Sequence, residues 1–122
     1  MEFFKIIEKQ TSEENIQEKI TPQNLENFTE SMFLLEQLEN DFIGATLWGE
    51  FLISYDKIKG GVRFALLDCP NALQWTITTD FSAERNKIVL HATINQTQKP
   101  DEFIEEIEEF LMEWEAGLNS QF

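Results

Sequence analysis

The sequence has few basic residues. Its 122 residues include 9 Lys and Arg against 23 Asp and Glu, which gives a formal net charge of -14. Nucleic-acid-binding proteins neutralise phosphates with Lys and Arg, and helices on anionic membrane surfaces carry the same residues. We therefore expect neither direct nucleic-acid binding nor membrane association. The charge favours a basic protein partner, or it serves only to keep the chain soluble.

Cysteine and histidine occur once each, as Cys69 and His91. A single cysteine excludes an intramolecular disulfide and every multi-cysteine metal site, and it suits a reducing compartment. A Ser-His-Asp or Cys-His arrangement would need His91, but no motif such as G-x-S-x-G accompanies it. Glycine patterns of nucleotide-binding loops are also missing. We predict a protein that is not an enzyme, with no catalytic residue, cofactor or metal.

Long apolar runs are absent as well. No stretch approaches the ~20 apolar residues of a membrane span. The N-terminal sequence MEFFKIIEKQ has neither the basic region nor the apolar region of a secretion signal. Because neither a membrane span nor a secretion signal is recognised, we predict a cytoplasmic protein. No linker or repeat divides the chain, so we predict one domain, residues 1–122.

The strongest pattern in the chain lies between Pro100 and Leu118. Its apolar residues recur on a 3.6-residue period: Phe103, Ile104, Ile107, Phe110, Leu111, Trp114 and Leu118. Asp101 is suited to cap the start of a helix, and Gly117 to a left-handed exit from it. The pattern predicts an amphipathic helix whose apolar side, with Trp114, is buried in the core.

The opposite side of this predicted helix is entirely acidic. It carries Asp101, Glu102, Glu105, Glu106, Glu108, Glu109, Glu113 and Glu115, without any Lys or Arg. Such a helix forgoes the i,i+4 ion pairs that would stabilise it. We therefore predict partner contacts for Glu102, Glu105, Glu106, Glu109 and Glu113. The alternative is a solvated helix face that only adds solubility.

The first third of the chain is predicted to be helical. Residues 3–9 are too short to assign by period and are interpreted as helix. A helix is expected from residue 11 or 12 to about 20, and a longer one from Pro22 to about residue 40. Phe33 projects from the polar side of this longer helix. We predict that it contacts a partner or the N-terminal segment.

After Gly44 the apolar period changes from 3.6 to 2, which is typical of strands. Strands are predicted at 45–56, 62–68, 72–79 and 87–94, with a polar loop at 80–86 that can include a helical turn. We expect an α+β two-layer domain. It consists of a four-stranded antiparallel meander with N-terminal helices and the C-terminal helix packed on one face.

The other face of the predicted sheet mixes polar side chains with apolar ones, which are Trp48, Leu52, Ala65, Leu67 and Val89. If uncovered, such a patch reaches the size at which an association surface is expected. We predict contacts for Trp48, Leu52 and Leu67. Residues 1–20 as a cover, a homodimer through this face, and a separate partner remain open alternatives.

Three classes of function agree with these features. The first and favoured one is a non-enzymatic module that masks a basic partner, such as a toxin immunity protein or a nuclease inhibitor. The second is a small acidic dimeric chaperone for an extended segment, because the chain is similar to type III secretion chaperones in size, charge and α+β composition. The third is a small-ligand carrier or enzyme with a cavity behind Trp75 and Trp114.

Overall fold

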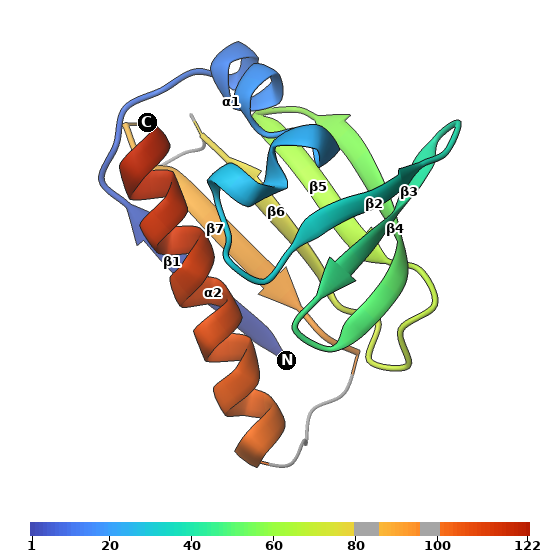
Figure 1. The fold of residues 1–122 in the computed structure, drawn as a ribbon. Helices are drawn as coiled ribbons and strands as arrows, with labels where there is room; N and C mark the ends of the chain where they lie inside the picture. The colour runs from blue at the N-terminus through green and yellow to red at the C-terminus, as the bar shows by residue number, and fades with distance from the viewer. Residues whose placement is uncertain (80–85, 96–100) are drawn as a thin grey trace.

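One curved antiparallel sheet of seven strands forms the frame of the part of the chain that the structure describes (Figure 1). The structure is a computed structural model that describes residues 1–79, 86–95 and 101–122. Its elements follow the order β1 (Glu2–Ile7), α1 (Glu13–Lys19), the 3-10 helix η1 (Pro22–Asn27), β2 (Phe33–Gln37), β3 (Asp41–Thr46), β4 (Gly49–Ile58), β5 (Gly61–Leu66), β6 (Gln74–Thr78), β7 (Ile88–Thr93) and α2 (Asp101–Gln121). The strand order is β1-β7-β6-β5-β4-β3-β2, a meander to which the first strand is added beside the last.

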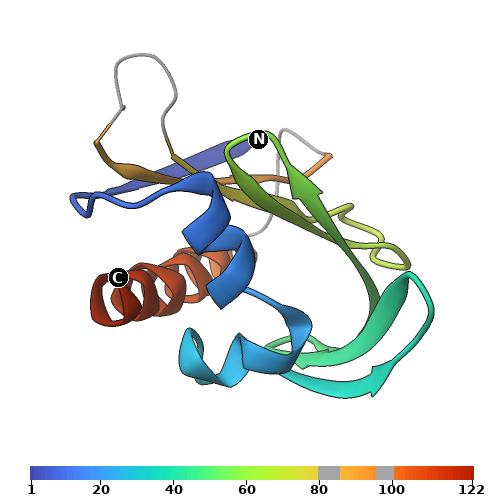
Figure 2. The same ribbon diagram turned by 90° about the horizontal axis from the view of Figure 1, so that it is seen from above.

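The helices share one side of this sheet. Figure 2 shows α1, η1 and α2 within the curve of the sheet, so that none of the described helices lies on its convex face. In β7, Ile88, Leu90 and Ala92 are buried on the concave side, and the residues between them are partly exposed. None of the helices in the described ranges is long and apolar enough to cross a membrane.

The predicted four-stranded sheet is wrong, although the α+β class and the antiparallel meander are confirmed. One error lies at 45–56, which is not a single strand: β3 ends at Thr46 and β4 begins at Gly49. The Thr46 hydroxyl accepts a hydrogen bond from the Trp48 N–H at 3.0 Å and donates one to the Gly49 carbonyl at 2.8 Å. Gly49 has a φ of 118°, which favours glycine, and the chain therefore reverses in a tight hairpin.

The predicted helices at 3–9 and 22–40 are the other errors. Residues 2–7 form β1, because their pairing with β7 buries Ile7. Helix η1 ends at Asn27, and the chain turns at Thr29, whose hydroxyl accepts a hydrogen bond from the Met32 N–H at 3.1 Å. The next residues form β2. Tertiary pairing has therefore overruled the local pattern in both segments.

The remaining predicted elements are confirmed, with small changes in their bounds. Helix α1 begins after Ser12, whose side chain accepts a hydrogen bond from the Asn15 N–H at 3.1 Å. Strands β6 and β7 lie within the expected ranges, β5 begins one residue earlier, at Gly61, and α2 begins at Asp101. The helical turn expected within residues 80–86 lies outside the described residues, except for Asn86.

The core between the sheet and α2 is rich in aromatic rings. Trp114 is fully buried, as predicted, and its ring lies 5.8 Å from that of Phe64 and 6.2 Å from that of Trp75, centroid to centroid. Phe110 meets Trp75 edge to face at 4.9 Å. These rings occupy the space behind Trp75 and Trp114 in which a ligand cavity was one of the alternatives.

Gly117 does not end α2, contrary to the sequence interpretation. The helix continues to Gln121. A Cβ atom at residue 117 would lie 2.1 Å from the carbonyl oxygen of Phe28 and 2.6 Å from its Cα atom. Glycine is therefore required because the backbone that follows η1 lies directly against α2.

We predict that Gly117→Ala lowers the free energy of unfolding by about 1–3 kcal/mol, the usual cost of overpacking. The higher helix propensity of alanine would by itself stabilise α2 by about 1 kcal/mol. Urea unfolding measures the net change in the free energy of unfolding that these two opposite effects produce. The exposed Ser120→Ala change is the matched control and should be nearly neutral. A Gly117→Ala protein more stable than wild type would contradict the close approach.

Tyr55 joins β4 to the end of α1. Its hydroxyl donates a hydrogen bond to the Ile20 carbonyl at 2.5 Å, and partial burial raises its pKa from 10.0 to about 12. The unfolded state therefore ionises at a lower pH than the folded state. The stability that this difference contributes is complete below pH 10 and is lost as the pH rises towards 12.

We predict that Tyr55→Phe costs about 1 kcal/mol at neutral pH, the usual worth of one hydrogen bond. The variant should lose less stability than wild type between pH 10 and 12. Tyr55 is the only tyrosine of the chain, so phenolate absorbance reports its pKa directly. A titration midpoint near 10 in the folded protein would refute the assigned burial.

Candidate functional site

Charge is divided unevenly over the fold. The sequence has no Lys or Arg between Lys19 and Lys57, and none within α2. The first of these stretches contains η1, β2 and β3, and its acidic residues are Glu26, Glu30, Glu36, Glu39, Asp41, Glu50 and Asp56. Basic residues lie elsewhere, for example Lys5 on β1 and Arg63 on β5. The two acidic stretches, residues 20–56 and α2, therefore carry negative charge without any Lys or Arg.

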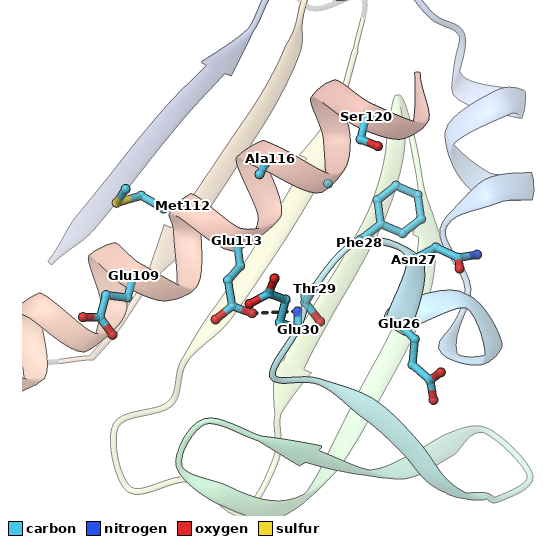
Figure 3. A pocket seen from close by; sticks show the side chains of 11 residues that line it. Glu26, Asn27, Phe28, Thr29, Glu30, Glu109, Met112, Glu113, Ala116 and Ser120 are labelled. Atoms are coloured by element: carbon cyan, nitrogen blue, oxygen red, sulfur yellow. Dashed lines mark hydrogen bonds between the residues drawn. The ribbon is translucent and has the colours of Figure 1, made fainter.

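A hollow of about 590 Å³ lies where these two acidic stretches meet. It is formed by α2 on one side and by residues 26–30 on the other (Figure 3). The residues that line it include four glutamates, Glu26, Glu30, Glu109 and Glu113, together with the apolar residues Phe28, Met112 and Ala116. The hollow therefore combines an apolar wall with acidic groups.

Glu113 also has a structural role. Its Oε1 atom accepts hydrogen bonds from the Glu30 N–H at 2.9 Å, the Ser31 N–H at 3.0 Å and the Ser31 hydroxyl at 2.9 Å. Figure 3 shows this side chain reaching from α2 towards Glu30. Hydrogen bonds to a carboxylate are stronger than those between neutral groups. Glu113 is thus not a freely solvated residue, although it still lines the hollow.

The other predicted glutamates continue the acidic surface along α2. Glu102, Glu105, Glu106 and Glu109 line a second, smaller hollow of about 310 Å³, and Glu109 belongs to both hollows. Within the described residues none of these four forms an ion pair, whereas Glu108 pairs with Lys5 at 3.5 Å. The five glutamates predicted from the sequence therefore form one row that ends in the larger hollow.

Trp48 does not lie on the open face of the sheet, where the sequence interpretation placed it. Because the chain reverses at residues 47–48, its ring packs against α2, 5.9 Å from Phe103 and 5.5 Å from Phe110 between centroids. Its indole nitrogen is buried without a hydrogen-bond partner. Trp48 therefore holds the β3–β4 turn against the helix.

The convex face brings together three other predicted contact residues. Leu52 is paired with Ile43, and the Leu67 N–H donates to the Leu52 carbonyl at 2.8 Å. Phe33, the first residue of β2, lies opposite Ala45, so its side chain belongs to the same side of the sheet as Leu52. Sequence analysis assigned Phe33 to a helix and could not bring it near Leu52.

A second apolar area of the convex face lies at the other edge, where Phe4 and Ile6 are 58% and 46% exposed. Polar residues such as Thr76 on β6 separate it from Leu52. Residues 1–20 do not cover this face, because β1 extends the sheet and α1 lies on the concave side (Figure 2).

His91 lies beside that second area. Its Nε2 atom is 3.0 Å from a carboxylate oxygen of Glu2, and its ring stacks on Phe4 with 4.3 Å between centroids. Cys69 lies in the turn that follows β5. Neither residue lines the acidic hollow.

Sequence analysis missed Glu26 and Glu30. It placed them within the predicted helix from Pro22 to about residue 40. Their approach to α2 depends on the turn at Thr29, which that prediction did not include. One signal was available, namely the absence of basic residues between Lys19 and Lys57. The comparisons with known proteins add nothing to this picture: no protein-family model matches the chain, and no curated protein is significantly similar to it.

We predict that Glu113→Ala lowers the free energy of unfolding by about 2 kcal/mol, because it leaves three donors without their charged acceptor. Glu106→Ala is the matched control on the same helix, and it should change stability by less than about 0.5 kcal/mol. Chemical denaturation compares the two variants. Equal effects would mean that the bonds from Glu30 and Ser31 do not stabilise the fold.

Proposed function

We propose that the protein is a non-enzymatic binding module that masks a basic protein partner, in the manner of a toxin immunity protein or a nuclease inhibitor. The observation that carries this proposal is the hollow in which carboxylates from α2 meet those of residues 26–30. Clefts with one sign of charge focus the electric field and attract ligands of the opposite sign. The single free cysteine is compatible with the reducing cytoplasm as the site of action.

The lining of the hollow is suited to a Lys or Arg side chain of the partner. The long aliphatic stem of such a side chain can cover Phe28 and Ala116, while its charged end reaches Glu30 or Glu109. Arg would fit well, because its planar guanidinium can bind carboxylates through two hydrogen bonds at once. The row of glutamates along α2 then attracts further basic residues of the same partner.

Several carboxylates in this region also repel one another, which destabilises the free protein. A basic partner relieves that repulsion on binding. Complementary charge mainly increases the rate of association, and salt screens it with a Debye length of about 10 Å at 0.1 M.

A second candidate function is a dimeric chaperone that associates through the convex face. The exposed Phe4 and Ile6 favour it, since large apolar side chains side by side on a surface are typical of association sites. Analytical ultracentrifugation distinguishes the two candidates. A dimer that Phe4→Ser and Ile6→Ser together dissociate would support the chaperone.

We predict that replacing Glu105, Glu106 and Glu109 together by Gln slows association with the basic partner about tenfold at low salt, because steering by charge is weakened. The matched control replaces Glu8, Glu14 and Glu18 by Gln, which changes the net charge equally but lies outside both acidic hollows. Immobilised wild-type protein is first used to capture partners from native cell extract, and stopped-flow mixing then gives the rates.

The control variant should associate almost as fast as wild type, and the difference between the variants should shrink at high salt. Equal rates for both triple variants would mean that net charge alone acts. A partner whose capture is indifferent to salt would refute the proposed function.

A further inference from the structure

The two edge strands of the sheet, β1 and β2, differ in the charged residues on and beside them. Strands β1 and β2 are the first and the last in the strand order, so each has one side without a neighbouring strand. Helix η1 lies against β2, and its Gln23 side chain donates a hydrogen bond to the Gln37 side chain at 2.9 Å. An open edge offers unpaired N–H and C=O groups with which an extended segment of another chain can pair. The residues around each edge decide which segment would be accepted.

The edge at β2 combines apolar exposure with acidic charge. Phe33, Leu35 and Leu38 are 42%, 45% and 39% exposed. Glu36 lies within the strand and Glu39 follows it, and this part of the chain contains no Lys or Arg. An added strand that alternates basic and apolar residues would match both features, since it presents cations to the glutamates and apolar side chains to Phe33 and Leu35.

The edge at β1 is more nearly neutral. Glu2 and Lys5 both belong to the strand, and Lys9 follows Glu8. Lys5 is already paired with Glu108. Exposed apolar side chains are present at both edges, so charge is what distinguishes them, and it favours β2 for a basic segment.

Strand β2 is also continuous with the acidic hollow. It begins at Phe33, directly after the turn in which Glu30 and Ser31 are bonded to Glu113. An extended segment on the edge of β2 therefore leads at one end towards the hollow. A basic side chain there could enter the hollow without a change in direction of the segment.

The irregular pairing of β2 with β3 makes unspecific strand pairing at this edge less favourable. Its register with β3 shifts between Leu34 and Glu36, which leaves Leu35 as a bulge. Bulges and charges on edge strands discourage unspecific pairing. Two copies of this chain would bring their acidic edges together and repel. The edge therefore discriminates against a second copy and in favour of a basic strand.

We propose that the basic partner adds an extended segment to the open edge of β2 and places a Lys or Arg side chain of that segment in the hollow at Glu30, Glu109 and Glu113. This inference rests on the proposed function and deepens it, because it specifies the conformation in which the partner is bound. Backbone hydrogen bonds supply affinity, and alternate side chains supply specificity.

The probe is a short synthetic peptide of alternating lysine and valine, together with the same peptide methylated at every backbone nitrogen. Methylation retains the charge but removes the donors that a strand needs. Fluorescence anisotropy at low salt should give at least a tenfold weaker Kd for the methylated peptide. Hydrogen exchange should slow at amides of β2 and not at those of β1 when the unmodified peptide is bound.

Leu35→Lys and Phe4→Lys form the matched pair of variants. Both replace an exposed apolar residue on an edge strand by the same cation, so they change the net charge equally. Leu35→Lys should weaken binding of the unmodified peptide at least tenfold, and Phe4→Lys less than twofold. Equal weakening, or protection at β1, would overturn the assignment of the edge.

The experiment also separates the two proposals. Salt-sensitive binding of both peptides with the same Kd would overturn the pairing with β2 and support the capture of basic partners. No salt-sensitive binding of either peptide would overturn both proposals.

Discussion

The contact between Gly117 and the backbone of Phe28 is the constraint on which the acidic hollow depends. It fixes the segment after η1 against α2 at a distance that no other residue type permits. The hydrogen bonds from Glu30 and Ser31 to Glu113 hold the same segment one helical turn earlier on α2. Packing thus brings together two acidic stretches that would otherwise separate. The hollow can persist although four glutamates line it, because the close contact at Gly117 and the hydrogen bonds to Glu113 hold its two walls together.

The sequence predicted those elements whose signal is local. The apolar period of α2, the cap at Ser12 and the alternation in β5, β6 and β7 each depend on residues close together in the chain. They emerge in the structure as expected, with Trp114 in the core. The row of glutamates on α2 was visible for the same reason, since helical spacing alone puts Glu102, Glu105, Glu106, Glu109 and Glu113 on the side away from the apolar stripe.

Elements that depend on distant partners could not be predicted in this way. Strand β1 exists because it pairs with β7, whose residues lie near the other end of the chain. Residues 28–32 turn because Thr29 and Glu113 bind their N–H groups, and only the first of these is nearby in sequence. The hairpin at Trp48 was hidden for another reason, since an apolar run across a tight turn has the same alternation as one long strand. These errors misplaced Trp48 and Phe33 and concealed Glu26 and Glu30.

The distribution of charge in the fold is more informative than its total. A net charge of -14 spread evenly would account for solubility alone. Here Lys5 of β1 pairs with Glu108 of α2, and the pairs Arg63–Asp56 and Lys87–Glu8 lie on or beside β1, β4, β5 and β7. The carboxylates of the two hollows have no such partners within the described residues. Stability alone would favour interspersed Lys or Arg at these positions as well, so this distribution supports the proposal that a basic partner supplies the missing positive charge.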